Sequence, residues 1–293
     1  MIEAVRPIAA SGAPRRTAAQ VICAGALALL TWPAFAHAIE VWSTTEEFSF
    51  GFLVPPVSAL LIWWHRAELR ASLGRGANSG LAIVFVALAV YLLAYRVGIN
   101  ALAGFAVVPL LLGVVVYLWG WAAGRVLAFP IGFLAFGLGL YRGLLDSVGF
   151  AMQGVTATGA AALASAAGVG VVRDGLVLRS SGFASSEFAF VVAQTCSGMS
   201  SLVSLLALAA LWTHVAQGKL GARFAVLASV LPLVILANTM RVSLVLLIAS
   251  SYGQEAALGF FHGASSLMLF GLALAGLLVV SRVVGCKVPR LAI

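Results

Sequence analysis

The chain has 293 residues, of which 62% are hydrophobic and only 9% are charged. Its mean hydropathy of +1.10 is higher than any soluble domain needs, which excludes an ordinary soluble fold and indicates a polytopic membrane protein. The formal net charge of +8 would suit a nucleic-acid-binding protein, but no basic run with interleaved aromatic residues is present. We therefore expect no nucleic-acid partner and assign the charge to cytoplasmic loops.

Apolar stretches of about 20 residues, the length that crosses a bilayer as a helix, define the predicted elements in chain order. Eight spans are predicted, at 21–39, 50–64, 80–95, 102–121, 126–141, 197–216, 224–245 and 262–281. Segment 150–169 is rich in Ala and Gly, and we interpret it as a re-entrant or interfacial helix, with a full span as the alternative. We do not interpret the N-terminus as a cleavable signal peptide, because its apolar part is long and further spans follow.

The predicted fold class is therefore an all-α polytopic membrane protein with one domain over residues 1–293. Its N-terminal tail (1–20) and C-terminal tail (282–293) are expected in the cytoplasm. Segment 142–195 is expected to be extracytoplasmic or re-entrant.

The distribution of charge supports this topology. With the N-terminus inside, 12 of the 17 basic residues fall on the inner side: Arg6, Arg15, Arg16, Arg66, Arg70, Arg75, Arg125, Lys219, Arg223, Arg282, Lys287 and Arg290. Seven of the nine acidic residues fall outside. The positive-inside rule therefore favours eight spans in the inner or plasma membrane, with both termini cytoplasmic. A ninth span at 150–169 would put Lys219, Arg223 and the basic tail on the wrong side.

A small β element is predicted before the sixth span. Residues 171–178 have an Asp174-Gly175 pair between β-branched or apolar flanks, which is a hairpin signal. Residues 187–192 have the composition of a further short strand. We expect this element to lie outside the membrane and to lead to the start of the following helix.

A polar cluster, Gln194 to Ser201, interrupts the apolar sequence at that helix start and contains Cys196. The other two cysteines, Cys23 in the first span and Cys286 in the basic tail, have the setting of structural residues. Arg241 and His262 follow at the mouths of the next two spans, on the extracytoplasmic side like Cys196. Polar groups in lipid are costly and tend to be functional.

A thiol, a guanidinium and an imidazole together indicate nucleophilic catalysis. A thiol attacks as the thiolate, and a helix N-terminus or a nearby cation lowers its pKa. His262 suits a general base and later acid, because histidine titrates near neutral pH. Arg241 stays charged, so it suits an electrostatic clamp on an oxyanion or a substrate carboxylate.

Neighbouring residues could support these three. Gly198 permits a tight backbone path, and Ser197, Ser200 and Ser201 could cap helix N–H groups that also hold a developing oxyanion. Asn238 lies three residues before Arg241 on the same helix face and could orient it or donate to the substrate.

Each residue alone also has a structural interpretation. A lone buried cysteine is usually a small hydrophobe, an arginine near a helix end usually snorkels, and a histidine there usually packs at the interface. The placement of all three on one face of consecutive spans favours catalysis. By the same standard His37, His65 and His214 are set aside, because His65 belongs to a basic inner loop and the other two lie near helix ends without a matching partner.

These motifs resemble those of the exosortase/archaeosortase family of multi-pass membrane cysteine enzymes. Thr195 to Met199 is similar to its Cys-Ser-Gly-apolar signature, Asn238 to Val242 to its Asn-x-x-Arg-apolar motif, and His262 follows on the next helix. An upstream stretch, Ser49 to Ser58, continued by Trp63 to Arg66, is similar to a family motif near the second helix. The resemblance covers the chain from about residue 40 onward.

The resemblance implies a transpeptidase or protease that processes exported, membrane-anchored proteins. Their C-terminal tail has a short motif (Pro-Glu-Pro in the best-known class), a transmembrane helix and a basic cluster. Cys196 would be the nucleophile, His262 the general acid/base and Arg241 the transition-state stabiliser, with Ser197, Gly198 and Asn238 in support. The acceptor, an amine or water, stays open. No cofactor and no metal are expected.

Two departures concern the subfamily. Gly263-Ala264-Ser265-Ser266 stands where an acidic residue and then a glycine are expected, and Phe50 stands where His or Tyr is commoner. Two other classes stay open, namely a transporter with Arg241 as an anion site and a non-catalytic factor for envelope or polysaccharide export. A transporter predicts broken helices in corresponding halves, which the sequence does not have. An intramembrane serine protease is disfavoured because no Gly-x-Ser-x-Gly element accompanies the cluster.

Overall fold

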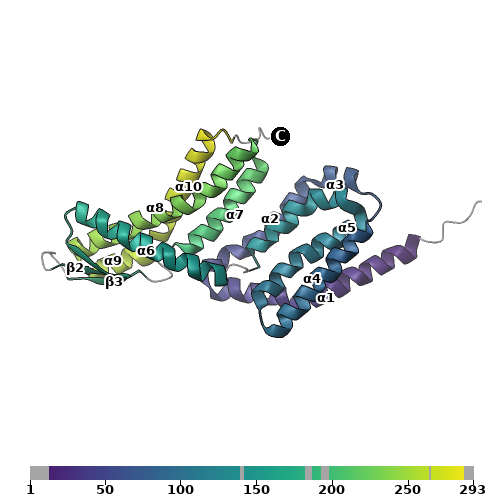
Figure 1. The fold of residues 1–293 in the computed structure, drawn as a ribbon, viewed down its shortest axis with the longest axis horizontal. Coiled ribbons are helices and arrows are strands. Elements are labelled where there is room, and N and C mark those ends of the chain that lie inside the picture. Colours follow the sequence, from purple (N-terminus) through teal and green to yellow (C-terminus); the bar gives the residue numbers. More distant parts are fainter. Residues whose placement is uncertain (1–12, 139–141, 182–186, 193–197, 264, 287–293) are drawn as a thin grey trace, which may run out of the picture.

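The computed structural model describes residues 13–138, 142–181, 187–192, 198–263 and 265–286. The described chain is mostly helical and forms two groups of helices (Figure 1). The N-terminal half, purple to blue in the figure, holds α1 to α5. The C-terminal half, teal to yellow, holds α6 to α10 and a small sheet. All-α architecture with one small β element agrees with the predicted fold class.

The N-terminal half begins with a helix of 32 residues and continues with helices that are short, straight or folded back on themselves. Its elements are α1 (Ala13–Thr44), η1 (Glu46–Leu53), α2 (Val54–Trp64), α3 (Arg66–Ser72), α4 (Asn78–Val97), α5 (Asn100–Phe133) and η2 (Leu134–Phe136). The Trp42 indole N–H donates to the Gly137 carbonyl at 2.7 Å, and the Tyr91 hydroxyl donates to the Leu30 carbonyl at 2.7 Å. These two side-chain hydrogen bonds connect α1 with α4 and with the residues after α5.

The helix labelled α5 contains a reversal of the chain. Gly120 has φ 85° and ψ 175°, which is outside the helical region. Val116 Cγ2 lies 2.6 Å from the point where a Cβ on Gly124 would stand. Residues eight apart in a straight helix are separated by about 12 Å along the axis, so the chain must fold back at Gly120. The two arms correspond to the spans predicted at 102–121 and 126–141.

The C-terminal half is built around one long helix. Its helices are α6 (Arg142–Ala166), α7 (Met199–Val215), α8 (Leu220–Tyr252), α9 (Gln254–Gly263) and α10 (Ser265–Val283). The 33-residue α8 contacts all four of the others. Its apolar neighbours form two clusters, one with α7 and α10 around Leu205, Val230 and Leu269, and one with α6 around Ala160 and Leu246.

The sheet has three antiparallel strands in the order β1-β2-β3: β1 (Val171–Asp174), β2 (Val177–Ser180) and β3 (Ala189–Val191). Both predicted strand segments are therefore confirmed. The turn differs by one residue from the predicted Asp-Gly turn. Asp174 pairs with Val177, so the two loop residues are Gly175 and Leu176. Gly175 has φ +61° and no described non-glycine residue has positive φ, which is the pattern of a hairpin turn with glycine at its first central position.

Two predicted boundaries are wrong in the C-terminal half. The seventh span was expected to end at 245, but α8 continues to Tyr252 and ends at Gly253, whose φ is +88°. The eighth span was expected to begin at 262, but residues 254–263 form the separate helix α9. Ala249 and Ser250 are buried against neighbouring elements, and this packing lets the helix continue beyond 245.

Length and composition identify membrane-spanning candidates. Among the described residues, α4, the stretch Asn100–Phe136 and α8 are long and apolar enough to cross a bilayer. The bent pair Phe48–Trp64 and Arg66–Ser72, with 63° between its parts, gives a fourth candidate if it is one span. Shorter apolar helices cover Ser201–Val215 and Leu267–Val283. These helices support a membrane protein, and the number of eight spans stays a prediction.

Residues 150–166 of the predicted segment 150–169 belong to α6, which is 25 residues long and is not among these membrane-spanning candidates. Its small residues Ala157, Ala160 and Ala164 pack against Val242 to Ala249 on α8. The helix therefore covers the second half of α8.

Candidate active site

Arg241 is buried inside the C-terminal half with only 5% of its surface exposed. Its Nε–H donates to the Ser265 Oγ at 3.1 Å, and Ser265 is the fully buried first residue of α10. A buried guanidinium is tolerated only when it is hydrogen-bonded, so this contact fixes the head group of Arg241 against the start of α10. The sequence predicted Arg241 at the end of its helix. In the structure it lies 11 residues before the end of α8 at Tyr252.

Asn238 lies one turn before Arg241 and is also fully buried. Its Nδ2–H donates to the Thr156 Oγ1 on α6 at 3.3 Å. The next residue, Thr239, packs closely on Gly159 of α6. A Cβ added to Gly159 would stand 2.7 Å from the Thr239 Cγ2. A polar stretch of α8 is therefore fixed by α6 on one side and by α10 on the other.

Gly198 is the N-cap of α7 and has left-handed φ +79° and ψ 15°. A Cβ at this position would stand 3.2 Å from Val234 Cγ1 and 3.4 Å from both Cβ and Cγ of Asn238. Glycine is thus favoured by the backbone conformation and also by the lack of space. Gly198 itself has no side chain that could cap the first turn of α7. The positive end of the helix dipole at this start favours an anion or a thiolate next to it.

The structure describes some of the predicted site residues and not others. Cys196 and Ser197 lie outside the described residues, two positions and one position before Gly198. His262 lies in α9, three residues before Ser265, and its side chain is outside the described part. Gly198, which follows Cys196, therefore packs against Asn238. Ser265, which follows His262, accepts the hydrogen bond from Arg241. Both contacts meet residues 238–241 of α8.

Sequence reasoning missed the partners of these residues. Thr156 and Ser265 are 82 and 24 residues away from the side chains that they bond. Thr156 did not stand out in the sequence, and Ser265 was noted only as part of a departure from the family pattern. No local sequence pattern marks the distant partner of a single buried Ser or Thr.

His214, which was set aside for lack of a matching catalytic partner, has ring partners in the structure. Its ring stacks on Phe129 with centroids 3.7 Å apart and lies 5.5 Å from the His65 ring. His37 lies 3.7 Å from Glu40. Position 214 is 16 residues after Gly198, about 24 Å along the helix, so the His65–His214 contact lies at the opposite end of α7. It joins α2 and α7 with the second arm of α5.

No group of three or more His, Cys, Asp or Glu side chains within the described ranges is arranged to hold a metal ion. Cys286 is a free thiol in the described part and is packed in the core with Gly218, which suits the structural interpretation of this residue.

Comparison with known proteins gives one family. The sequence profile of the transmembrane exosortases matches residues 42–279, which is most of the chain. No curated protein and no solved structure matches this chain. The matched range includes the described polar stretch of α8, the start of α7 and all of α9. The chain therefore belongs to the transmembrane exosortase family.

Proposed function

We propose that this protein is a cysteine transpeptidase or protease that cleaves the C-terminal sorting tail of exported membrane-anchored proteins. The observation that carries the proposal is the convergence on residues 238–241 of α8. Gly198, two residues after Cys196, packs on Asn238, and Ser265, three residues after His262, accepts a hydrogen bond from Arg241. The segments that follow Cys196 and His262 thus both contact the buried polar stretch that forms the third motif.

In the proposed reaction, the Cys196 Sγ attacks the carbonyl carbon of a peptide bond in the substrate while His262 accepts the thiol proton. The C–N bond then breaks as His262 gives that proton to the leaving amine, and a thioester joins the substrate to Cys196. An amine or a water molecule attacks the thioester, His262 accepts its proton, and the thiol is restored.

Arg241 supplies a fixed positive charge for the oxyanion that forms in both steps. Its burial makes that charge more effective than one in water, and its bond to Ser265 limits its reorientation. The positive end of the α7 dipole lies at Gly198, two residues after Cys196, and suits both a thiolate and an oxyanion.

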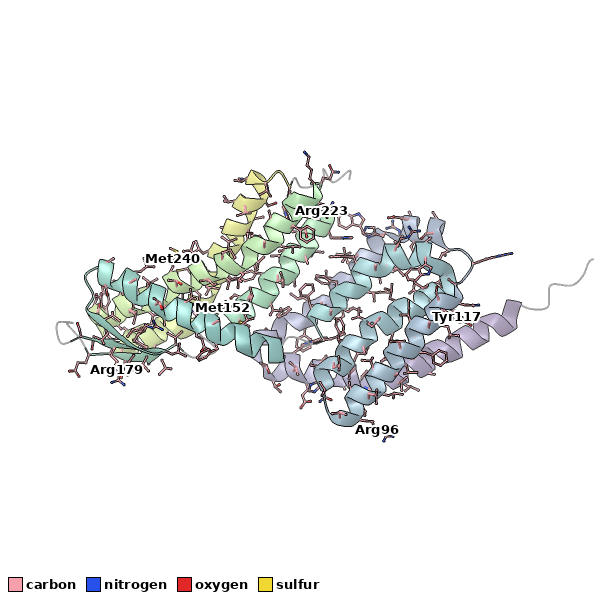
Figure 2. All side chains as sticks on the ribbon, viewed as in Figure 1. Arg96, Tyr117, Met152, Arg179, Arg223 and Met240 are labelled. Carbon is pink, nitrogen blue, oxygen red and sulfur yellow. The ribbon has the colours of Figure 1, made fainter. Side chains whose placement is uncertain are left out.

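The proposed topology has eight spans, both termini in the cytoplasm and the site on the extracytoplasmic side of the inner or plasma membrane. The reversal at Gly120 supports two separate crossings in α5. Arg223, expected inside, and Arg179, expected outside, lie at opposite ends of the C-terminal half (Figure 2). A substrate motif that has been exported would reach the side of Arg179.

Co-expression with a substrate tests the function. A protein that ends in a Pro-Glu-Pro motif, a transmembrane helix and a basic cluster would be produced with the wild type, Cys196→Ala, Arg241→Ala or His262→Ala, and tail removal followed on a gel. We expect no processing without Cys196 and a loss of about 100-fold or more without Arg241, as for removal of an oxyanion donor. Membrane levels of each variant serve as the control.

The alternatives give different results in the same experiment. A transporter or a non-catalytic export factor would tolerate Cys196→Ser and Cys196→Ala. Unchanged processing in the cysteine variants would therefore reject the enzyme and favour those classes.

A further inference from the structure

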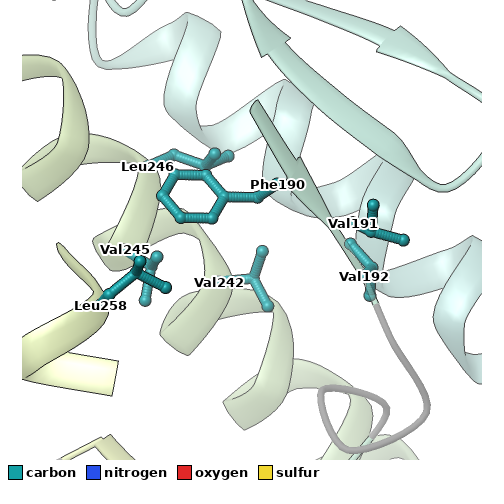
Figure 3. Close-up of a pocket in the computed structure, with 7 residues that line it drawn as sticks. All are labelled: Phe190, Val191, Val192, Val242, Val245, Leu246 and Leu258. Atoms are coloured by element: carbon teal, nitrogen blue, oxygen red, sulfur yellow. The ribbon is translucent and has the colours of Figure 1, made fainter. Parts of the chain in front are cut away.

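A small apolar pocket lies between the end of the sheet and helices α8 and α9 (Figure 3). It has a volume of about 110 Å³ and is lined by residues 190–192, by Val242, Val245 and Leu246 of α8, and by Leu258 of α9. The α8 residues form its buried floor, whereas Val191 and Leu258 are 61% and 41% exposed and border its mouth.

Each lining element leads directly to a candidate catalytic position. Val192 is the last described residue before the segment 193–197, which contains Cys196. Val242 follows Arg241 on α8. Leu258 lies four residues, or one helical turn, before position 262 on α9. Three separate elements therefore connect the pocket in sequence with residues of the proposed site.

The strand beside the pocket has an edge suited to an extended peptide. In the part of the chain that the structure describes, β3 pairs with β2 alone and ends the sheet. Ser180 N–H donates to the Phe188 carbonyl and Val192 N–H donates to the Leu176 carbonyl, so residues 188, 190 and 192 direct their backbone groups toward β2. Ala189 and Val191 consequently direct theirs outward.

A peptide paired with the outer edge of β3 would direct every second side chain to the face of the sheet that borders the pocket. Residues directly opposite one another in an antiparallel or parallel pair project to the same face of a sheet. A residue opposite Phe190 would therefore project with the Phe190 side chain, which points toward α8 in Figure 3. Strand addition of this kind obtains affinity from backbone bonds and specificity from pockets for alternate side chains.

The size and chemistry of the pocket restrict what enters it. An apolar cavity of about 150 Å³ holds benzene, and this pocket is smaller, so it fits a side chain such as Val or Leu and not an aromatic ring. None of its lining residues is polar or charged, so an acidic side chain would be buried there without a partner.

On the basis of the proposed function, we infer that this pocket is the specificity pocket for one aliphatic residue of the substrate near its scissile bond. The substrate is held as an added strand on β3. Acidic residues of the sorting motif lie outside the pocket.

Leu258 is the position at which to test the pocket, because its partial exposure allows a change of size without disturbing the core. Leu258→Trp fills the pocket and Leu258→Ala enlarges it. Each enzyme is co-expressed with a series of Pro-Glu-Pro-tailed substrates in which every residue flanking the motif is replaced in turn by Ala, Val, Leu or Phe. Leu231→Trp, at a residue of α8 with 42% exposure, is the matched control.

We expect one substrate position at which the wild type processes Val or Leu about tenfold faster than Ala or Phe. Leu258→Trp should shift that preference to Ala, Leu258→Ala should admit Phe, and Leu231→Trp should leave the ranking unchanged. The pocket assignment would be overturned if the wild type and the three variants ranked the substrates with Ala, Val, Leu and Phe in the same order at every position. Processing by Cys196→Ala in a parallel sample would instead reject the catalytic function, so the two failures are distinguishable.

Discussion

Arg241 and Ser265 illustrate how single residues determine the candidate site. A guanidinium with 5% exposure, in a helix with apolar neighbours, needs hydrogen-bond acceptors, and the Ser265 hydroxyl supplies one at 3.1 Å. Arg241 and Asn238 were predicted as functional from sequence, because polar residues inside an apolar span are rare. Their partners were not, because contacts across 24 and 82 residues depend on packing and not on local sequence.

Ser265→Ala tests whether this bond positions Arg241. Loss of the acceptor should destabilise the protein by about 1–3 kcal/mol and lower processing by about tenfold, because the Arg241 head group becomes less well fixed. Ser265→Thr keeps the hydroxyl and should restore processing. Thermal unfolding in detergent and tail removal report the two effects. If Ser265→Ala processes the substrate as the wild type does, the bond has no part in catalysis.

Gly198→Ala tests the start of α7. The left-handed backbone costs an alanine about 1–2 kcal/mol, and its Cβ would press on Val234 and Asn238, so we expect a lower melting temperature and a strong loss of processing. Gly154→Ala is the control, because Gly154 lies in the helix α6 with nothing within 4 Å of its Cβ position. That change should be neutral or slightly stabilising. Equal effects of the two substitutions would contradict the assigned role of Gly198.

At the scale of elements, the sequence predicted types better than ends. The strands at 171–178 and 187–192 were predicted from β-branched residues and a turn signal, both of which are local. The turn itself is centred one residue later, at Gly175 and Leu176, because the strand register and the positive φ of Gly175 decide it. The extension of α8 to Tyr252 was not predicted, since it depends on packing against α6 and α9.

The contact between α5 and α7 gives a prediction at this scale. The rings of Phe129 and His214 stack at 3.7 Å with an angle of 2° between their planes. A double-mutant cycle with Phe129→Ala and His214→Ala should give a coupling of about 0.5–1.5 kcal/mol in the free energy of unfolding. Additive effects of the two substitutions would mean that the stack does not hold the two helices together.

At the scale of the whole molecule, the two halves meet along apolar contacts among Val54, Phe133 and Ala207. Composition alone predicted a helical membrane protein, because 62% hydrophobic residues are more than a soluble core can use. The arrangement of the halves was not predictable from periodicity, since every apolar helix has more than one possible neighbour.

Cysteine labelling in whole cells tests the proposed topology. In a background that lacks Cys23, Cys196 and Cys286, Asp174→Cys in the hairpin should react with a membrane-impermeant maleimide in intact cells, because it is expected outside. Arg75→Cys and Lys219→Cys should react only after permeabilisation. Labelling of Lys219→Cys in intact cells would contradict the orientation of the C-terminal half.

The most direct test of the central claim is to detect the thioester between Cys196 and the substrate. Membranes that contain the enzyme and a Pro-Glu-Pro-tailed substrate would be quenched in acid and analysed by mass spectrometry, with and without hydroxylamine. We predict a substrate adduct on Cys196 that hydroxylamine removes and that Cys196→Ala lacks. Tail removal by Cys196→Ala, with no adduct on the wild-type thiol, would contradict the claim.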